Sequence, residues 1–502
     1  MSEVKKLPDG WVETMLGEIL PIQYGKGLVE SSRDKSGHIP VYGSSGIVGF
    51  HNHALTSKAT LIVGRKGSVG SIYYSKSPCW PIDTVYFVEE NTNLDLKFFL
   101  YLLSFLRLGQ FDRSTAIPGL SRDDYNAIKV KIAPFPEQHR IVAAIEQQFT
   151  RLDAGVAALK RAKTKLKRYR AAVLKAAVEG RLTETWRAEH PTTEPASLLL
   201  ERILDERRAK WEADLRAKGK DPAKVKYVEP AKPDVENLPE LPDGWCWASV
   251  EQICERIVDC LHSTATFQAA GFLCVDTNSI KPGRIVFEKI RYVDEDTFIE
   301  RNRRMKPQEN DVLFSREGAL LGVAVRLPAN LEICLGQRMM IFRLHRAVDA
   351  HYYEKVLNSS VFRSQYASEI TGTASPHLNV QDTRAFAIPL PPLAEQEQIV
   401  AEVERRLSII NELQATVEAN LKRAERLRQS ILQEAFAGRI VPQDPTDEPA
   451  SILLERIRDE RNNGHNASNK AGNGRHVLRA PEPVSLDVAE TAQAALWESI
   501  ER

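Results

Sequence analysis

A glycine-rich loop, GRKGSVG at Gly64–Gly70, carries Arg65 and Lys66 between glycines. Such a loop could present its cations to a phosphate or to the acceptor edge of guanine. It matches neither G-x-x-x-x-G-K-[ST] nor G-x-G-x-x-G before a helix, so a nucleotide-binding pocket is disfavoured. SREGALLG at Ser315–Gly322 stands at the corresponding place later in the chain. A plain turn between two strands is the alternative, and the loop by itself favours that interpretation.

Motifs for catalysis and for metal binding are scarce. The six cysteines include no C-x-x-C pair, and histidines such as His51, His53, His262 and His377 show no ligand spacing, so no metal site is predicted. The sequence also lacks [DN]-P-P-[YF], an F-x-G-x-G methyl-donor loop, H-E-x-x-H and G-x-S-x-G. We therefore expect a binding protein without catalytic residues, rather than an enzyme.

The composition is typical of a protein with reduced thiols that does not enter a membrane. The start, MSEVKKLPDGWVE, has no apolar stretch typical of a signal peptide. No apolar run reaches the roughly 18 residues that a membrane-spanning helix needs. We expect a cytoplasmic location.

Basic residues are concentrated at one place. The net charge is only +1, but KRAKTKLKRYR at Lys160–Arg170 has seven basic residues in eleven and no acidic residue. A nucleic-acid-binding protein of this net charge must gather its cations locally. A solvated helix face is the alternative, and the run alone favours it.

The chain is a tandem duplication of one long module. LPDGW occurs at Leu7 and again at Leu241, a displacement of 234, whereas Glu137 and Glu395 are displaced by 258. The later part of each module therefore has a fixed length, and the early part has diverged. The matched blocks are LPDGWVETMLGEI with LPDGWCWASVEQI, STAIPGL with GTASPHL, FPEQHRIVAAIEQQF with LAEQEQIVAEVERRL, EGRL with AGRI, and EPASLLLERI with EPASILLERI.

The fixed part predicts two long helices with matched heptads. Gln138–Glu179 has no proline and is followed by Gly180, which is typical of one uninterrupted helix about 60 Å long. Apolar residues recur every seven positions in both copies, as in a coiled-coil seam. We expect the two helices to pair antiparallel, with Lys163 and Arg170 facing Glu402 and Glu404; parallel pairing, or pairing with another protein, is the alternative. The predicted seam residues are Ile145, Leu152, Leu159, Leu166, Val173, Val403, Ile410, Val417 and Ile431.

The diverged parts are predicted to be mixed α/β domains. Strand-like runs such as ATLIVG and DTVYFVEE in the first copy and DVLFS and QRMMIFRL in the second are separated by turn formers. An apolar helix follows in each, at Leu96–Leu108 and at Ala350–Tyr366. Trp11 and Trp245 are expected to anchor the first strand or turn of each domain, with no role in binding DNA.

The predicted fold class is therefore α+β. Two mixed α/β domains alternate with two long helices that pair as an antiparallel coiled coil, and a pseudo-two-fold axis relates the duplicated modules. The predicted boundaries are 1–134 for the first domain, 135–212 for a central helical region, 213–240 for a linker, 241–392 for the second domain, 393–461 for a C-terminal helical region and 462–502 for a low-complexity tail. A short amphipathic helix is expected within AETAQAALWESIE at the end of the tail.

This layout resembles the DNA-specificity subunit of type I restriction–modification enzymes, over residues 1 to about 460. The P-x-x-E-Q-x-x-I-V block at each helix start and E-G-R-L or A-G-R-I at each helix end carry the resemblance. A Thr/Pro/Leu loop, with Thr115, Pro118 and Leu120 in one copy and Thr373, Pro376 and Leu378 in the other, agrees with it.

The resemblance implies that each variable domain is a target recognition domain that reads one half of a bipartite site in double-stranded DNA. The paired helices would set the spacer and dock methyltransferase subunits, two of them in our expectation, and the restriction and translocase subunits would join that assembly. S-adenosylmethionine, ATP and Mg²⁺ would act on those partners, with no cofactor in this chain. The alternative is a coiled-coil scaffold with two protein-binding domains.

Neither recognition domain is basic in bulk. Residues 1–134 hold 15 Lys or Arg against 13 Asp or Glu, and residues 241–390 hold 17 against 18. Affinity for DNA without specific contacts should therefore be modest. For any single candidate, a solvated surface residue remains the simpler interpretation. By position in loops, the candidate DNA-binding residues are Tyr42, Ser44, Ser45, Arg65, Lys66, Arg303, Arg304, Lys306, Arg316 and Arg338.

Overall fold

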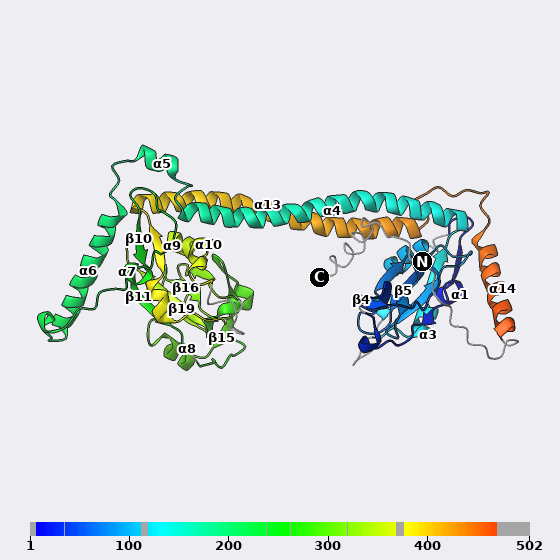
Figure 1. Cartoon of the computed structure of the whole chain (residues 1–502), viewed down its shortest axis with the longest axis horizontal. Helices are drawn as coiled ribbons and strands as arrows, with labels where there is room; N and C mark the ends of the chain where they lie inside the picture. The colour runs from blue at the N-terminus through cyan, green and yellow to red at the C-terminus, as the bar shows by residue number, and fades with distance from the viewer. Residues whose placement is uncertain are drawn as a thin grey trace, which may run out of the picture. The chain divides into compact units, whose positions relative to one another are not determined.

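A computed structural model describes residues 7–34, 36–111, 119–236, 238–261, 263–318, 320–367 and 376–468, with side chains as far as residue 460. The chain divides into two compact units (Figure 1). One contains Met1–Leu159 with Ala419–Arg502, and the other contains Lys160–Glu418. Thr115, Pro118, His262, Thr373 and the predicted helix at the end of the tail lie outside the described residues.

The first unit contains a four-stranded, a three-stranded and a two-stranded sheet. Asp95 caps helix α2(Leu96–Leu106), because its carboxylate accepts hydrogen bonds from two first-turn amides. The four-stranded sheet has the order β2(Gln23–Tyr24)-β8(Val85–Glu89)-β5(Thr60–Gly64)-β6(Ile72–Ser75), the three-stranded sheet β4(Gly46–His51)-β3(Ile39–Gly43)-β7(Trp80–Pro81), and the pair β1(Val12–Met15)-β9(Lys129–Ile132). The helices are α1(Leu16–Ile19), α2(Leu96–Leu106) and α3(Arg122–Asn126).

The second unit repeats this topology. In both units the three-stranded sheet joins one antiparallel and one parallel pair of strands. The matching sheets are β11(Cys254–Asp259)-β19(Met339–Leu344)-β16(Val312–Ser315)-β17(Ala324–Arg326), β15(Arg291–Val293)-β12(Phe272–Val275)-β18(Ile333–Leu335) and β10(Cys246–Ser249)-β20(Ala387–Leu390). A hairpin, β13(Ile280–Lys281)-β14(Arg284–Ile285), and helix α8(Glu295–Asn302) lie between β12 and β16, where the second copy is longer. The duplication therefore persists in the topology although the sequences have diverged.

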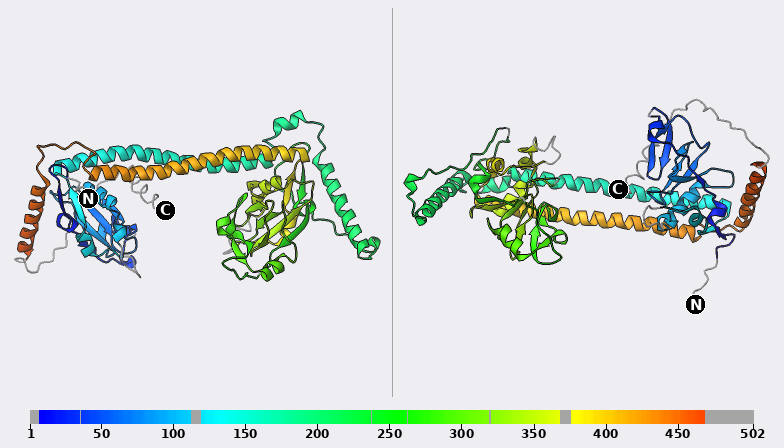
Figure 2. Two further views of the ribbon diagram at one scale, coloured as in Figure 1. Left: turned by 180° about the vertical axis from the view of Figure 1, so that it is seen from behind. Right: turned by 90° about the horizontal axis from the view of Figure 1, so that it is seen from below.

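Two helices of 44 residues contribute to both units: α4(Phe135–Val178) and α13(Leu393–Phe436). Within each unit, a segment of α4 lies beside a segment of α13: 135–159 beside 419–436 in the first unit, and 160–178 beside 393–418 in the second (Figure 2). In the second unit Lys163 pairs with Glu418 at 3.0 Å and Arg170 bonds to Asn411, so partner numbers fall along α13 as they rise along α4. In the first unit Arg428 pairs with Asp153, and Gln443 bonds both to Glu137 and to Gly438, so the partner numbers fall along α13 there as well. The contacts within each unit are therefore antiparallel.

The predicted seam faces the interior of each unit. Ile145 and Ile431 are buried in the core of the first unit, and Val173, Val403 and Ile410 are buried in that of the second. Val417 is also buried. Leu152, Leu159 and Leu166 are half-buried. Leu152 packs against the core of the first unit, and Leu166 packs against that of the second.

The prediction that Lys163 and Arg170 face Glu402 and Glu404 was wrong. Glu402 accepts bonds from Arg405 and Arg406 of its own helix, and these guanidinium groups lower the pKa of Glu402 to about 2. Glu404 lies 3.4 Å from the ring of His351. The heptad register predicted which face Lys163 and Arg170 occupy, but not the offset between the two helices. That offset places them at Glu418 and Asn411.

Three other boundaries differ from the sequence-based ones. The helix expected at Ala350–Tyr366 is broken into α9(Ala350–Leu357) and α10(Ser360–Ser364), because Ser359 caps a new helix and the Asn358 side chain bonds the backbone of Ala324. Helix α6(Ala196–Ala217) continues into the predicted 213–240 linker. Helix α14(Ala450–Ser468) continues into the predicted 462–502 tail.

All six cysteines are free thiols, and five of them are buried. Among the described residues no helix is long and apolar enough to cross a membrane. The same residues contain no group of His, Cys, Asp or Glu arranged to hold a metal ion.

Candidate nucleic-acid interface

The end of the four-stranded sheet brings several predicted residues of the first unit together. Thr84, just before β8, accepts the backbone amides of Arg65 (2.9 Å) and Lys66 (3.2 Å) on its carbonyl oxygen. Its hydroxyl accepts the amide of Ser44 at 3.3 Å. Lys66 and Ser45 are exposed. The Gly64–Gly70 loop and the β3–β4 turn therefore form one surface.

Arg65 lies in an aromatic setting that the sequence did not predict. Its guanidinium group lies 4.9 Å from the centre of the Tyr24 ring and 5.7 Å from that of Tyr86. The guanidinium group of Arg122 lies 5.7 Å from the centre of the Tyr24 ring. Tyr24 is 49% exposed, whereas Tyr86 is buried. Burial raises the pKa of Tyr86 to about 12. Arg65 also donates to the carbonyl oxygen of Asp83 at 3.2 Å. The result is an exposed tyrosine flanked by two cations.

Tyr42 does not join this surface. Its side chain is buried, 6.2 Å from the ring of Tyr73. Tyr73 in turn donates from its hydroxyl to the carbonyl oxygen of Ser44. Tyr42 therefore supports the turn at Ser44 from beneath.

The second unit builds the same corner with different side chains. The amide of Arg316 donates to the carbonyl oxygen of Arg338 at 2.9 Å, as that of Arg65 does to Thr84. Arg316 is only 9% exposed and donates at 3.3 Å to the carbonyl oxygen of Leu378, which belongs to the Thr/Pro/Leu loop. Arg316 therefore holds two loops together and offers little surface to a ligand.

The exposed cations of this corner come from neighbouring segments. Arg338 adopts a left-handed backbone (φ 66°) and pairs with Glu317 at 3.5 Å. Arg304 pairs with Asp259 at 2.5 Å. By strand register Asp259 is paired with Met340, two residues from Arg338, which brings Arg304 to the same end of the sheet.

Strand register also identifies the counterpart of Tyr24. Tyr24 pairs with Tyr86 on β8, two residues after Thr84, and Asp259 pairs with Met340 on β19, two residues after Arg338. The first unit thus presents a tyrosine stacked on arginines where the second presents an aspartate paired with one. Two identical scaffolds with different side chains at the same corner can recognise different ligands.

Lys306 and Arg303 lie just after α8. Lys306 pairs with Glu332 at 2.6 Å, and Arg303 with Glu300 at 3.6 Å. All four side chains are more than half exposed, so these ion pairs are screened and can exchange for a phosphate contact at little cost.

Each unit also contains a junction between its recognition domain and the long helices. The sequence repeats mark the segments that meet there, but not the contacts between them. Trp11 donates its indole N–H to the carboxylate of Glu137 at 3.1 and 3.2 Å, and Trp245 donates to Glu395 at 2.8 Å. Glu137 is 1% exposed and Glu395 is fully buried. The LPDGW block of each unit is therefore bonded to the E-Q block at the start of a long helix. Both blocks recur in both copies, and that recurrence was the available signal.

The two carboxylates differ in what else they bind. Glu137 accepts a bond from the neutral amide of Gln443 at 3.2 Å, and burial raises its pKa. Glu395 accepts from the hydroxyl of Thr183 (2.7 Å) and from the guanidinium group of Arg187 (3.3 Å), which lies in α5(Glu184–Glu189). The second junction therefore contains an ion pair, whereas the bonds to the first carboxylate come from neutral donors.

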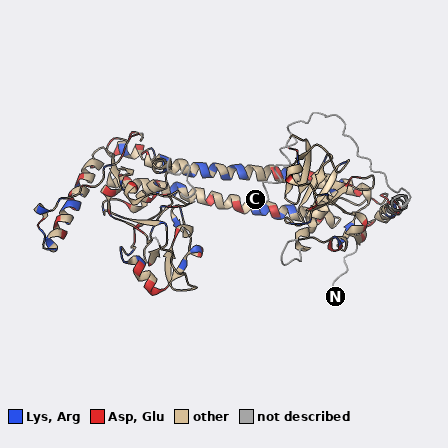
Figure 3. Ribbon diagram, turned by 60° about the horizontal axis from the view of Figure 1, so that its bottom comes forward, with Lys and Arg blue, Asp and Glu red and all other residues tan. Residues whose placement is uncertain are grey.

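The basic run Lys160–Arg170 lies on α4 within the second unit, where Figure 3 shows successive turns in blue. Most of its cations are exposed, apart from half-buried Lys160 and Arg170. Burial lowers the pKa of Arg170. The run is therefore a largely exposed basic surface, in which Lys163 pairs with Glu418.

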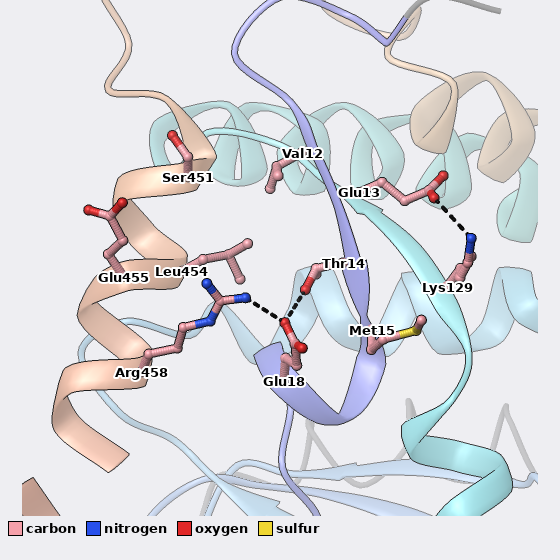
Figure 4. Close-up of a pocket in the computed structure, with 10 residues that line it drawn as sticks. All are labelled: Val12, Glu13, Thr14, Met15, Glu18, Lys129, Ser451, Leu454, Glu455 and Arg458. Atoms are coloured by element: carbon pink, nitrogen blue, oxygen red, sulfur yellow. Dashed lines mark hydrogen bonds and ion pairs between the residues drawn. The ribbon is translucent and has the colours of Figure 1, made fainter. Parts of the chain in front are cut away.

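A polar hollow of about 390 Å³ lies between β1 and α14 in the first unit (Figure 4). Four of the five charged residues that line it are paired: Glu18 accepts bonds from Arg458 (2.7 Å) and Thr14 (2.9 Å), and Glu13 pairs with Lys129 at 3.6 Å. The contacts of Glu18, on α1, link α14 to α1 and β1, and we assign no ligand to the hollow.

Comparison with known proteins gives a consistent result. The model of the type I restriction modification DNA specificity domain matches residues 8–165 and 275–423. The EcoDI specificity subunit of Escherichia coli is 24% identical over 482 residues, covering 93% of this chain and 99% of the relative. The EcoKI specificity subunit of Escherichia coli K12 is 24% identical over 380 residues, or 72% and 71% of the two chains. A chain from a solved type I restriction–modification system has a TM-score of 0.52 at 18% identity, covering 86% of this chain and 99% of that one.

Proposed function

This chain belongs to the type I restriction–modification DNA-specificity family, and we propose a role for each of its two units in recognising DNA. Recognition of DNA is the function of the chain. We propose that each unit reads one half of a bipartite site with the corner of its four-stranded sheet. The observation that carries this proposal is the pair of identical sheet topologies with different side chains at equivalent corners, Tyr24 in one and Asp259 in the other.

We propose that α4 and α13 form one antiparallel coiled coil across both units, with the duplicated modules related by a pseudo-two-fold axis. Helices of 44 residues are about 66 Å long. The antiparallel contacts within each unit and the buried heptad positions support this arrangement. A stiff pair of helices would fix the length of the spacer between the two half-sites.

We propose that the catalytic sites of the complex lie on partner subunits. Methyltransferase subunits, two in the simplest symmetric assembly, would carry S-adenosylmethionine, and the restriction and translocase subunits would use ATP and Mg²⁺. This chain would be non-catalytic and would contribute recognition, spacing and docking. The absence of methyl-donor and nucleotide motifs from the sequence supports that division.

Among the candidate contacts, Lys66 and Arg316 are expected to behave differently. Lys66 is exposed, so Lys66→Ala should weaken binding to cognate DNA and reduce the slope of log affinity against log salt by about one. Arg316 is buried against Leu378, so Arg316→Ala should lower the melting temperature as well as the affinity. Fluorescence anisotropy over a salt series, with thermal unfolding of each variant, separates the two. Unchanged affinity in Lys66→Ala would remove that side chain from the interface.

Exchange of the first recognition domain tests the proposed function. Replacing residues 12–132, from β1 to β9, with the corresponding domain of a relative should change one half of the methylated sequence and leave the other half unchanged. A scaffold with two protein-binding domains predicts no change in the methylated sequence. That outcome would favour the alternative over DNA recognition.

A further inference from the structure

We propose that Glu137 and Glu395 are positioning residues, each of which fixes the orientation of its unit's recognition sheets relative to the ends of the long helices. Loss of either carboxylate would then reduce the fidelity with which that unit reads its half-site. The inference rests on the proposed function, since it concerns the accuracy of the same readout.

Each carboxylate lies where several chain segments meet. In the first unit Glu137 lies in the first turn of α4, and Trp11 immediately precedes β1. Gln443 donates both to Glu137 and, at 2.7 Å, to the carbonyl oxygen of Gly438 at the end of α13. The amide of Ala450, which begins α14, donates to the carbonyl oxygen of Gly10 at 2.9 Å.

The second unit reproduces this arrangement with a different bridging side chain. Arg187 donates both to Glu395 at the start of α13 and to the carbonyl oxygen of Gly180 at the end of α4. The amide of Ala196, which begins α6, donates to the carbonyl oxygen of Gly244 at 2.8 Å. An amide in one unit and a guanidinium group in the other therefore make equivalent bridges between the carboxylate and the end of a long helix.

The glycines at the helix ends complete the junction. Gly180 (φ 68°) and Gly438 (φ 70°) adopt the left-handed conformation that ends a helix. A Cβ at these positions would come within 2.5 Å of Pro242 and 2.4 Å of Pro8, so the LPDGW block packs directly on the helix end. The start of the recognition domain thus touches the end of one long helix and is hydrogen-bonded to the start of the other.

Hydrogen bonds define direction, whereas apolar contacts do not. The cores of the two units include the sheets, the helix ends and the tryptophan rings, and these provide the bulk of the stability. The buried carboxylate adds bonds to defined donors on separate segments, so it specifies one orientation among those that the apolar contacts permit.

The test uses the full chain assembled with its methyltransferase subunits. Methylation rates are measured on the cognate site and on sites with one base changed in either half. For Glu137→Gln we expect discrimination to fall about tenfold in one half only, and for Glu395→Gln about tenfold in the other half only. Arg202 lies on α6, and Arg202→Leu, which breaks its exposed ion pair with Glu194, should leave both halves unchanged.

Equal loss in both halves, or full discrimination in both folded variants, would overturn the inference. If a glutamine variant does not fold, Trp11→Phe or Trp245→Phe decides, because each removes the indole N–H and must affect the same half as its glutamate. A wild-type complex that methylates no split site would contradict the proposed function itself, whereas intact split-site methylation with undiminished discrimination would contradict only this inference.

Discussion

Replacing Arg187 with leucine is expected to lower the free energy of unfolding of the second unit by about 3 kcal/mol, because it leaves a buried carboxylate without its cation. Glu395 would keep only the hydrogen bonds from Thr183 and Trp245. Arg187 would also lose its bonds to Gly180, so the end of α4 should loosen. Differential scanning calorimetry should show the transition of the second unit shifted downward, with that of the first unit unchanged.

A double variant separates the charge from the packing. Adding Glu395→Gln to Arg187→Leu should recover part of the loss, since the uncompensated charge is then gone. Leucine at Arg202 serves as the matched control, because that arginine forms an exposed pair that contributes little. A loss in Arg187→Leu no larger than that in Arg202→Leu would show that the second junction does not depend on its ion pair.

Replacing Phe436 with alanine is expected to destabilise the first unit by roughly 4 kcal/mol, in the range for large aromatic side chains removed from a core. Phe436 is the last residue of α13 and is 5% exposed. Its ring lies 5.5 Å from those of Phe98 and Phe105 on α2. It therefore joins the end of the long helix to the recognition domain, and hydrogen exchange should show α2 and the last turns of α13 opening together.

Val178 provides a control at the equivalent place. It ends α4 and is buried in the core of the second unit, but its side chain is aliphatic rather than aromatic. Val178→Ala removes two carbon atoms and should cost about 2 kcal/mol. If Phe436→Ala costs no more than Val178→Ala, the aromatic contact does not couple helix and domain as described.

The long helices were predictable because their signal is local and repeated. A seven-residue apolar pattern without proline requires no knowledge of tertiary structure, and α4 and α13 extend only slightly beyond the expected start at Gln138 and its counterpart. The mutual offset of the helices was not predictable. Lys163 meets Glu418 rather than Glu402 because packing at the two ends sets the register.

The recognition domains were predictable as mixed α/β but not in topology. Several strands have only two to four residues and pair across long stretches of chain, so their order depends on contacts that no local pattern records. The same holds for the candidate surface. Tyr24 and Arg122 are far apart in sequence, and Arg316 appeared equivalent to an exposed loop cation although its guanidinium group is buried.

The junctions between the recognition domains and the long helices were predictable only in part. The sequence repeats marked every segment that meets there, and Trp11 and Trp245 were correctly expected to anchor the start of each domain. Their partners were missed because a glutamate in the first turn of a helix is ordinarily an exposed residue that complements the helix dipole. Its burial against a tryptophan became apparent only from the fold.

Long-read methylation mapping of cells that express this chain with its methyltransferase subunits tests the central claim most directly. Two recognition units on one chain predict a single split motif, with two defined halves, a spacer of constant length and a methylated base in each half. The motif should disappear when this chain is deleted. A continuous motif without a spacer, or a split motif that persists without the chain, would contradict the account.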